Sequence, residues 1–199
     1  MAHIEELGGG NHDAGAQIVR SLYLNQPDLA NAGDGSAYSQ THAEYHPFFQ
    51  EYVSTYGYYD LFIVDKDGDI VYTVYKEDDF ATNLVDGHYA NENIAAAFQQ
   101  TITEGDTDFT MIEDFAYYTP SGAPASFIAT PIFAGGMAGG ELLGALIMQM
   151  PIDRLNTIMQ ENTGLGETGE TYLVGSDGFW RSDSRFLDEL GTESTILNP

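Results

Sequence analysis

The chain has 199 residues, of which 31 are Asp or Glu and only 6 are Lys or Arg, so its formal net charge is −25 at pH 7. This charge repels nucleic-acid phosphates and anionic membrane surfaces, and neither is expected as a partner. The absence of cysteine excludes disulfide bonds, thiolate catalysis and cysteine-ligated metals. Hydrophobic residues make up 43% of the chain, which is enough to build a buried core.

The first 57 residues are predicted to be mainly helical. Residues 1–12 lack the basic start and apolar run of a signal peptide and contain a GGG joint, so we expect a leader or flexible tail there. Residues 13–57 are expected to form a helical stalk, with helices over 13–25 and 41–57. Pro47 is expected at a first turn or at a kink. No run approaches the roughly 20 apolar residues of a membrane span, so membrane contact is expected only through segments absent here.

A β-hairpin and then three further strands are predicted after residue 57. YYDLFIVD and DIVYTVY are rich in β-branched and aromatic residues and are joined by KDG, which is typical of a tight hairpin. We expect a helix over 92–105, strands over 108–119, 125–134 and 141–151 with a turn at 135–140, and an amphipathic helix over 152–162 that packs through its apolar residues. Short turns between successive strands favour an antiparallel sheet. The predicted fold class is α+β, with a long N-terminal helix and a five-stranded antiparallel sheet flanked by helices on one side.

The sequence around the hairpin turn recurs near the C-terminus. LFIVDKDGDIVYT and TYLVGSDGFWRSD each have an apolar run, a turn that ends in Asp-Gly, and a second run that opens with a hydrophobic residue. We therefore expect two copies of one module. The first copy spans residues 58–162. The second begins at 163 and is incomplete at 199, because too few residues follow to complete its sheet.

The chain resembles the double Cache (PAS-like) sensor regions of bacterial chemotaxis receptors, sensor histidine kinases and cyclases in four segments: YYDLFIVDKDGDIVYTVYKEDDFATNL, YYTPSGAPASFIATPIF, LLGALIMQMPIDRLNTIM and TGLGETGETYLVGSDGFWRSD. The resemblance implies a PAS-like first module distal to the membrane. It also implies a non-enzymatic, extracellular or periplasmic ligand-binding domain that forms a homodimer through its N-terminal helices. The Arg-x-Trp-Tyr run by which some relatives hold amino acids is absent from this sequence.

One of the two lysines of the chain lies among acids in KEDDF, directly after the hairpin. In a PAS-like module, this segment lies over the sheet face where ligands bind. We expect Lys76 to pair with a ligand carboxylate, and Glu77 and Asp79 to receive a ligand ammonium group. The alternative is a structural ion pair that holds a loop. Tyr72, on the preceding strand, is included in the expected binding site.

The predicted strand over 108–119 supplies a second group of candidates. Alternate side chains of a strand share a face, so Asp114 and Tyr118 are expected to point one way and Phe115 the other. An acceptor beside an aromatic wall suits a cationic or polar ligand, and Phe127, across the next turn, extends that wall. The alternative is that these aromatic side chains simply pack in the core.

No cofactor, metal site or catalytic set is predicted. His42 and His46 share a helix face, but no third ligand is visible, and solvent-exposed histidines are the preferred interpretation. The acidic turn from Asp65 lacks the glycine and glutamate positions of an EF-hand calcium loop. GLGETG lacks the Lys-Ser/Thr of a phosphate-binding loop, and Ser182 and Ser184 lack the setting of a nucleophile elbow.

These features favour an extracytoplasmic sensor domain that binds a small polar molecule, amine-like or amino-acid-like, and passes a conformational change through its helices. The alternative, from another class, is an assembly protein in which other chains complete the unfinished second module at an open sheet edge.

Overall fold

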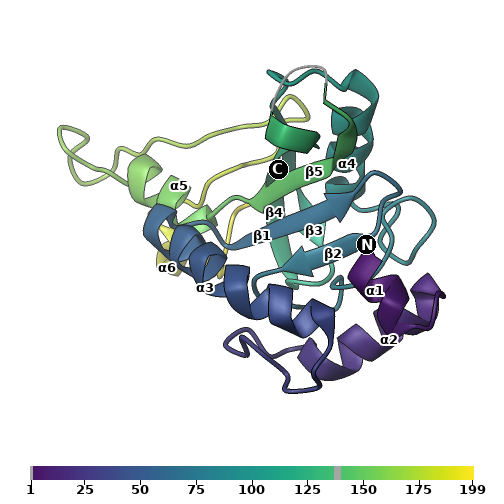
Figure 1. The fold of residues 1–199 in the computed structure, drawn as a ribbon. Coiled ribbons are helices and arrows are strands. Elements are labelled where there is room, and N and C mark those ends of the chain that lie inside the picture. The colour runs from purple at the N-terminus through teal and green to yellow at the C-terminus, as the bar shows by residue number, and fades with distance from the viewer. Residues whose placement is uncertain (1, 137–139) are drawn as a thin grey trace.

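The computed structural model describes residues 2–136 and 140–199. Its centre is one five-stranded antiparallel sheet with strand order β2-β1-β5-β4-β3 (Figure 1). The strands are β1 (Asp60–Asp65), β2 (Ile70–Thr73), β3 (Met111–Tyr118), β4 (Ala123–Phe133) and β5 (Leu142–Gln149). The predicted α+β class and antiparallel sheet are confirmed. The turn predicted at 135–140 lies partly outside the described residues; its first two residues belong to η1 (Ala134–Gly136), a short 3-10 helix.

The hairpin between β1 and β2 closes through a tight turn that an aspartate side chain supports. Asp65 Oδ1 accepts hydrogen bonds from the backbone N–H groups of Asp67 and Asp69, both at 3.0 Å. Gly68 has φ +96°, and a Cβ atom there would lie 2.6 Å from Val85 Cγ2. Only glycine fits this backbone and this space, so the predicted Asp-Gly turn is confirmed.

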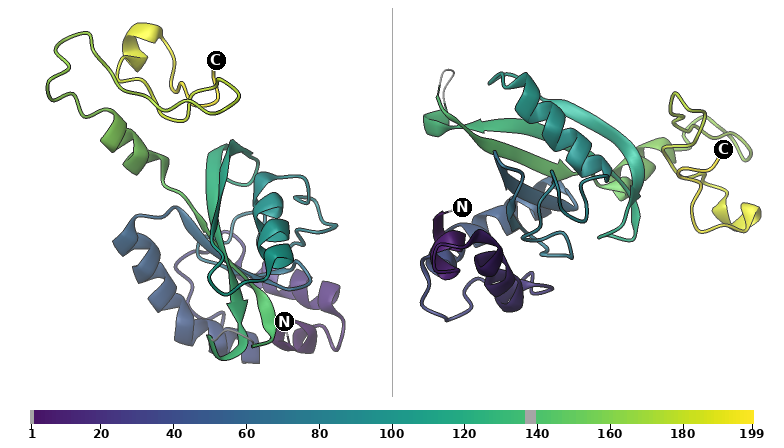
Figure 2. Two further views of the ribbon diagram at one scale, coloured as in Figure 1. Left: turned by 90° about the horizontal axis from the view of Figure 1, so that it is seen from above. Right: turned by 90° about the vertical axis from the view of Figure 1, so that its right-hand side faces the viewer.

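Helices cover both faces of the sheet, whereas the sequence predicts helices on one side (Figure 2). α4 (Asn93–Glu104) packs on one face, where Phe98 joins Phe62 and Phe127 in the main core. α3 (Ala37–Tyr56) packs on the other face, where Val53 joins Leu61. The sequence signal for two covered faces lies in β1, because its LFIV run is continuously apolar instead of alternating with polar residues.

The N-terminal part departs from the expected leader and stalk. Residues 2–7 form α1 (Ala2–Leu7), and its Ile4 is buried in one cluster with residues of α2 (His12–Tyr23). α3 begins at Ala37, because the Ser36 side chain accepts a hydrogen bond from the N–H of Ser39 and caps the helix. Pro47 therefore lies inside α3, beyond its first turn. The helix ends at the expected Gly57, which has φ +72°.

The C-terminal part leaves the sheet along α5 (Ile152–Met159), as Figure 2 shows. The apolar residues of α5 do not pack as predicted: none is buried and Ile158 is 65% exposed, because the helix projects beyond the sheet. In the described chain after residue 160, the second Asp-Gly turn is flanked by one isolated bridge, Val174 with Trp180, and the short helix α6 (Leu187–Leu190) follows. The division into modules at 58–162 and 163–199 stays a prediction.

Candidate functional site

The segment after β2, residues 74–84, folds back onto the hairpin and does not extend into solvent. The N–H of Ala81 donates to Ile70 O at 3.1 Å, and the N–H of Leu84 donates to Gly68 O at 2.8 Å. Phe80 and Leu84 are fully buried. Lys76 and Ala81 have φ of 56° and 55°, a left-handed conformation that costs a non-glycine residue about 1–2 kcal/mol. The segment is thus closely packed and carries local backbone strain.

Lys76 lies in the core, where its side-chain nitrogen donates hydrogen bonds to main-chain carbonyls. The residue is 0% exposed, and its Nζ donates to Thr73 O at 2.7 Å and to Val74 O at 3.4 Å. Nζ also lies 4.6 Å from the centre of the Tyr72 ring, a cation–π geometry. Within the described ranges, Lys76 takes part in no salt bridge. Burial lowers the pKa of Lys76 to about 7, against a smaller opposite effect of the Asp60 carboxylate.

Asp79, Tyr118 and Phe127 lie together in the core on the α4 face of the sheet. Tyr118 OH donates to Asp79 Oδ2 at 2.5 Å, and the Tyr118 ring packs edge-on against Phe127 with centroids 5.0 Å apart. Burial raises the pKa of Asp79 to about 7, although the hydrogen bond from Tyr118 opposes that rise. Asp79 Oδ1 is buried and has no hydrogen-bond partner among the residues that the structure describes. Burying this oxygen without a hydrogen-bond partner is unfavourable, and a ligand ammonium group beside it would supply the missing partner.

A second buried carboxylate, Asp60, is missing from the site that the sequence predicts. Its Oδ1 accepts hydrogen bonds from the backbone N–H groups of Leu61 at 2.6 Å, Val74 at 2.9 Å and Tyr75 at 3.3 Å. Burial raises the pKa of Asp60 well above its usual value. Backbone N–H groups supply the hydrogen bonds of Asp60, whereas one oxygen of Asp79 has no such partner among the described residues. Asp60 therefore holds the end of the hairpin in place. The sequence signal is weak, because an acid at the start of an apolar strand usually marks solvent.

Glu77 is half-buried and belongs to a different environment from Asp79. Its carboxylate accepts hydrogen bonds from Tyr59 OH at 2.8 Å and from Ser121 Oγ at 3.1 Å. Tyr59 and Ser121 border a hollow of about 480 Å³ at the end of the sheet, which Gln149 also lines. Glu77 therefore contacts groups at the junction of the sheet with α5, next to the Asp79 cluster but outside it.

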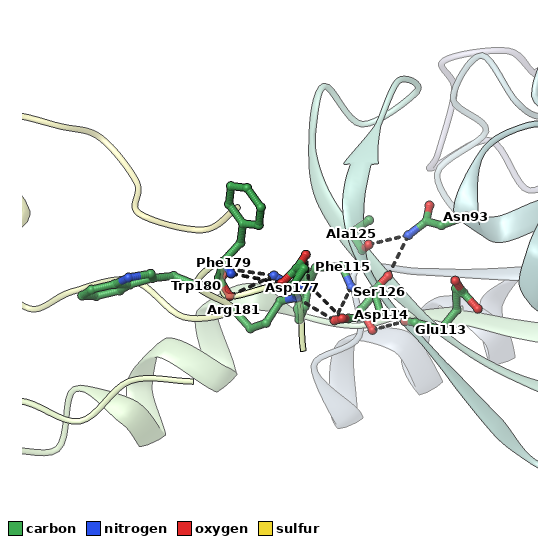
Figure 3. A network of polar contacts seen from close by, with 10 residues as sticks. All are labelled: Asn93, Glu113, Asp114, Phe115, Ala125, Ser126, Asp177, Phe179, Trp180 and Arg181. Carbon is green, nitrogen blue, oxygen red and sulfur yellow. Dashed lines mark hydrogen bonds and ion pairs between the residues drawn. The ribbon is translucent and has the colours of Figure 1, made fainter. Parts of the chain in front are cut away.

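Asp114 does not share a face with Tyr118, because a β-bulge between Glu113 and Ala116 shifts the alternation of β3. Its exposed carboxylate accepts hydrogen bonds from Arg181 Nε at 2.8 Å and Arg181 Nη2 at 2.9 Å (Figure 3). This pairing lowers the pKa of Asp114. Asp114 thus ties the C-terminal segment to β3. Arg181 lies in the quoted RSD motif, but its partner is not predictable from the sequence.

His42 and His46 are buried, at 5% and 0% exposure, and the prediction that they are solvent-exposed is wrong. Their rings stack with centroids 4.4 Å apart, and His46 Nδ1 lies 2.7 Å from Tyr72 OH. The spacing of the histidines fixes only that they share a helix face, and α3 packs that face onto β2. Tyr72 therefore lies on the α3 side of the sheet, on the opposite side from Tyr118. Residues 2–136 and 140–199 contain no group of three or more metal-ligating side chains.

Similar solved structures are ligand-binding domains, although no protein-family model and no curated protein matches the sequence. The ligand-binding domain of the Pseudomonas fluorescens chemoreceptor CtaA, solved with L-serine, matches with TM-score 0.50 and 12% identity over 99% of this chain and 74% of that one. The domain of the Pseudomonas aeruginosa amino acid chemoreceptor PctC, solved with GABA, has TM-score 0.50, 11% identity and coverages of 98% and 79%. The domain of Campylobacter jejuni Tlp3, solved with L-norvaline, has TM-score 0.51, 13% identity and coverages of 96% and 68%.

These structural similarities cover nearly the whole chain, but the sequence identity is low. They therefore establish the fold of the chain and not its function. In the described parts of the chain, no helix combines the length and the apolar character that crossing a bilayer needs. The chain therefore shares the fold of the ligand-binding domains of the chemoreceptors CtaA, PctC and Tlp3.

Proposed function

We propose that this chain is the non-catalytic sensor domain of a transmembrane receptor, lies on the extracytoplasmic side, and binds a small molecule that carries an ammonium group. The observation that carries the proposal is Asp79, a buried carboxylate with one oxygen held by Tyr118 and the other without a partner in the described chain. It lies in a domain whose structural neighbours were solved with L-serine, GABA and L-norvaline. Each of these ligands carries an amine.

Asp79 is fully buried, so a ligand reaches it only when residues 74–84 move. The positive φ angles of Lys76 and Ala81 are strained positions at which this segment can change conformation. A ligand that binds the rearranged form better than the packed form shifts the balance between them. This supplies the two states that a sensor requires, and α3 and α5 are the helices in position to transmit the change.

The first test is a thermal-shift and calorimetric screen with L-serine, GABA, L-norvaline and 1,4-diaminobutane, with acetate as the amine-free control. At 100 times its Kd, a ligand stabilises the native state by about 2.7 kcal/mol, which corresponds to roughly 5–10 °C in Tm for a chain of this size. We expect such shifts from at least one amine and none from acetate. No shift with any amine would contradict the proposal.

The matched variants are Asp79→Asn and Asp78→Asn. Asp78 is adjacent in sequence but its side chain is 68% exposed. We expect Asp79→Asn to abolish amine binding and Asp78→Asn to preserve it. Binding to the parent should also weaken about tenfold per pH unit below pH 7, as Asp79 becomes protonated. Unchanged affinity in Asp79→Asn would place the ligand elsewhere.

We also propose that two copies pair through α3. Tyr45, Phe48 and Tyr56 are 50%, 61% and 55% exposed along this helix, and such a row of aromatic side chains is typical of an interface. We expect a dimer in sedimentation equilibrium, and a folded monomer for the double variant Phe48→Glu, Tyr56→Glu. A parent that sediments as a monomer at high concentration excludes this pairing.

The second candidate function is that of an assembly protein, and the edge strand β3 supports it. β3 ends the sheet and carries exposed Ile112 and Tyr117, at 68% and 59%. An open edge with apolar side chains recruits further strands. Sedimentation separates the two functions, because polymers longer than a dimer are expected only from edge-to-edge assembly.

A further inference from the structure

A second hollow lies on the opposite side of the sheet from Asp79, between α1, α3 and the β1–β2 hairpin. Its volume is about 330 Å³, at the lower end of the range for small-molecule sites. Its wall is mainly apolar and aromatic and includes Ile4, Tyr38, His42, Phe49, Val71 and Tyr72. The hollow therefore suits a compact apolar molecule of one ring or two fused rings.

The wall carries no acidic side chain, lysine or arginine among the residues that the structure describes. The buried Lys76 ammonium group lies behind it, 4.6 Å from the centre of the Tyr72 ring. A cation finds no carboxylate in the described wall, and an anion finds no lysine or arginine there. The ligand that fits this lining is electrically neutral.

The buried polar groups of the wall offer acceptors and no free donors. His42 Nδ1 lies 2.7 Å from Ala30 O, so it must carry the proton and donate, which leaves Nε2 as an acceptor in the neutral ring. Burial lowers the pKa of His42 to about 3, which keeps the ring neutral. His42 Nε2 is buried and finds no hydrogen-bond partner in residues 2–136 or 140–199.

The two buried tyrosine hydroxyls of the wall have already used their protons. Tyr38 OH donates to Val71 O at 3.1 Å. His46 Nε2 must donate to Pro27 O at 2.7 Å, so His46 Nδ1 accepts the proton of Tyr72 OH. Among the described buried polar groups of the wall, His42 Nε2 is the acceptor left without a donor, and a ligand that brings a donor would satisfy it.

We propose that this hollow is a second ligand site, separate from the Asp79 cluster, for a neutral aromatic molecule with one N–H or O–H donor, of the indole or phenol class. The aromatic rings of the wall pack against the ligand, and the donor completes the hydrogen bonding of His42. The site is independent of the amine site, because the two lie on opposite sides of the sheet.

The test compares indole with 1-methylindole, which has nearly the same shape and no N–H, by isothermal titration calorimetry. Loss of one hydrogen bond to a buried acceptor weakens binding about tenfold, so we expect 1-methylindole to bind the parent about tenfold more weakly than indole. Equal affinities, or no binding of indole, would overturn the proposal.

Two variants locate the site. Thr41 is exposed on α3 and borders the hollow, so Thr41→Trp should fill it and abolish indole binding without unfolding the protein. His42→Phe keeps an aromatic ring but removes the acceptor, and should bind indole and 1-methylindole equally. Asp79→Asn should bind indole like the parent, which distinguishes failure of this proposal from failure of the amine site. Parent-like indole affinity in Thr41→Trp would overturn the assignment.

Discussion

Three buried ionisable residues lie near the end of β2, and two of them satisfy the main chain whereas the third does not. Asp60 accepts backbone N–H groups at that end, and Lys76 donates to the carbonyls of Thr73 and Val74. These two charges replace strand partners that the short β2 lacks. Asp79 is the exception, because one of its oxygens is left without a partner in the described structure. Among these three residues, this oxygen makes Asp79 the candidate ligand contact.

Asp79→Asn is expected to stabilise the protein at pH 7 by about 2 kcal/mol or more, since a pKa unit is worth about 1.4 kcal/mol. The folded-state pKa of Asp79 is raised from 3.8 to about 7. The stability that this group contributes is therefore fully present below pH 3.8 and is lost as the pH rises to 7. Urea denaturation of parent and variant between pH 4 and 8 measures the difference. The expected gain grows with pH across this window.

Asp78→Asn serves as the control, since its side chain is 68% exposed and should change stability by no more than about 0.5 kcal/mol. A parallel pH dependence of Asp79→Asn and the parent would show that the Asp79 carboxylate does not titrate in this window. The variant also sharpens the ligand test, because lost amine binding in a more stable protein does not result from unfolding.

The sequence draws attention to KEDDF, because this segment holds a rare lysine, but it does not predict that these charges are buried. In the structure, Lys76 and Asp79 are both fully buried. The alternative to ligand binding was a structural ion pair that holds the loop, but Lys76 instead donates to main-chain carbonyls and lies over the Tyr72 ring. The sequence does not show which backbone carbonyls lack a strand partner at the end of β2. Nor does it show that the face of α3 with His42 and His46 packs against the sheet.

At the scale of elements, β3 shows where a period-two pattern fails. The strand was predicted with Asp114 and Tyr118 on one face, and a bulge moves Asp114 outward. The bulge is held from outside the strand: Asn93 Nδ2 donates to Asp114 O at 3.1 Å, and Ser126 Oγ donates to Glu113 O at 2.6 Å (Figure 3). Strands and short turns are predictable from local residues, whereas a bulge depends on side chains distant in sequence.

Arg181→Ala is expected to release the C-terminal segment from β3. Arg181 contacts both Asp114 and Asp177, and the Asp177 carboxylate accepts a hydrogen bond from Arg181 Nη2 at 2.9 Å. The Arg181 side chain is only 9% exposed. Without it, residues 172–183 lose this link to the sheet. Limited proteolysis and hydrogen exchange should show faster cleavage and exchange in this segment, with the exchange of β1 and β5 unchanged.

Gly175→Ala should reproduce the effect of Arg181→Ala. A Cβ atom on Gly175 would lie 2.3 Å from Arg181 Nη2, so the guanidinium must leave its place. Arg185→Ala is the matched control: Arg185 donates to the carbonyls of Gly166 and Glu167, within the C-terminal part itself. Equal protection of residues 172–183 in the parent and in Arg181→Ala would show that the contacts of Arg181 with Asp114 and Asp177 do not hold the segment.

At the scale of the whole molecule, one sheet separates two environments. The α4 face holds the Asp79–Tyr118 pair, and the α3 face holds the histidine stack and the hollow beside it. The continuous apolar run of β1 accounts for both faces being covered. The formal net charge of the chain is −25, and most of it lies on the surface, since few of the acids are buried.

This surface charge predicts that salt stabilises the protein. At 0.1 M ionic strength, charges interact over about 10 Å, and at 1 M over about 3 Å. A compact state with a formal charge of −25 loses repulsion as this distance shrinks, and the expanded unfolded chain loses less. We expect Tm at pH 7 to rise by at least several degrees between 0.05 and 1 M NaCl. The same titration near pH 4.1, the sequence isoelectric point, is the control, because little net repulsion is left to screen there. An equal rise at both pH values would mean that salt acts on apolar burial instead of on the net charge.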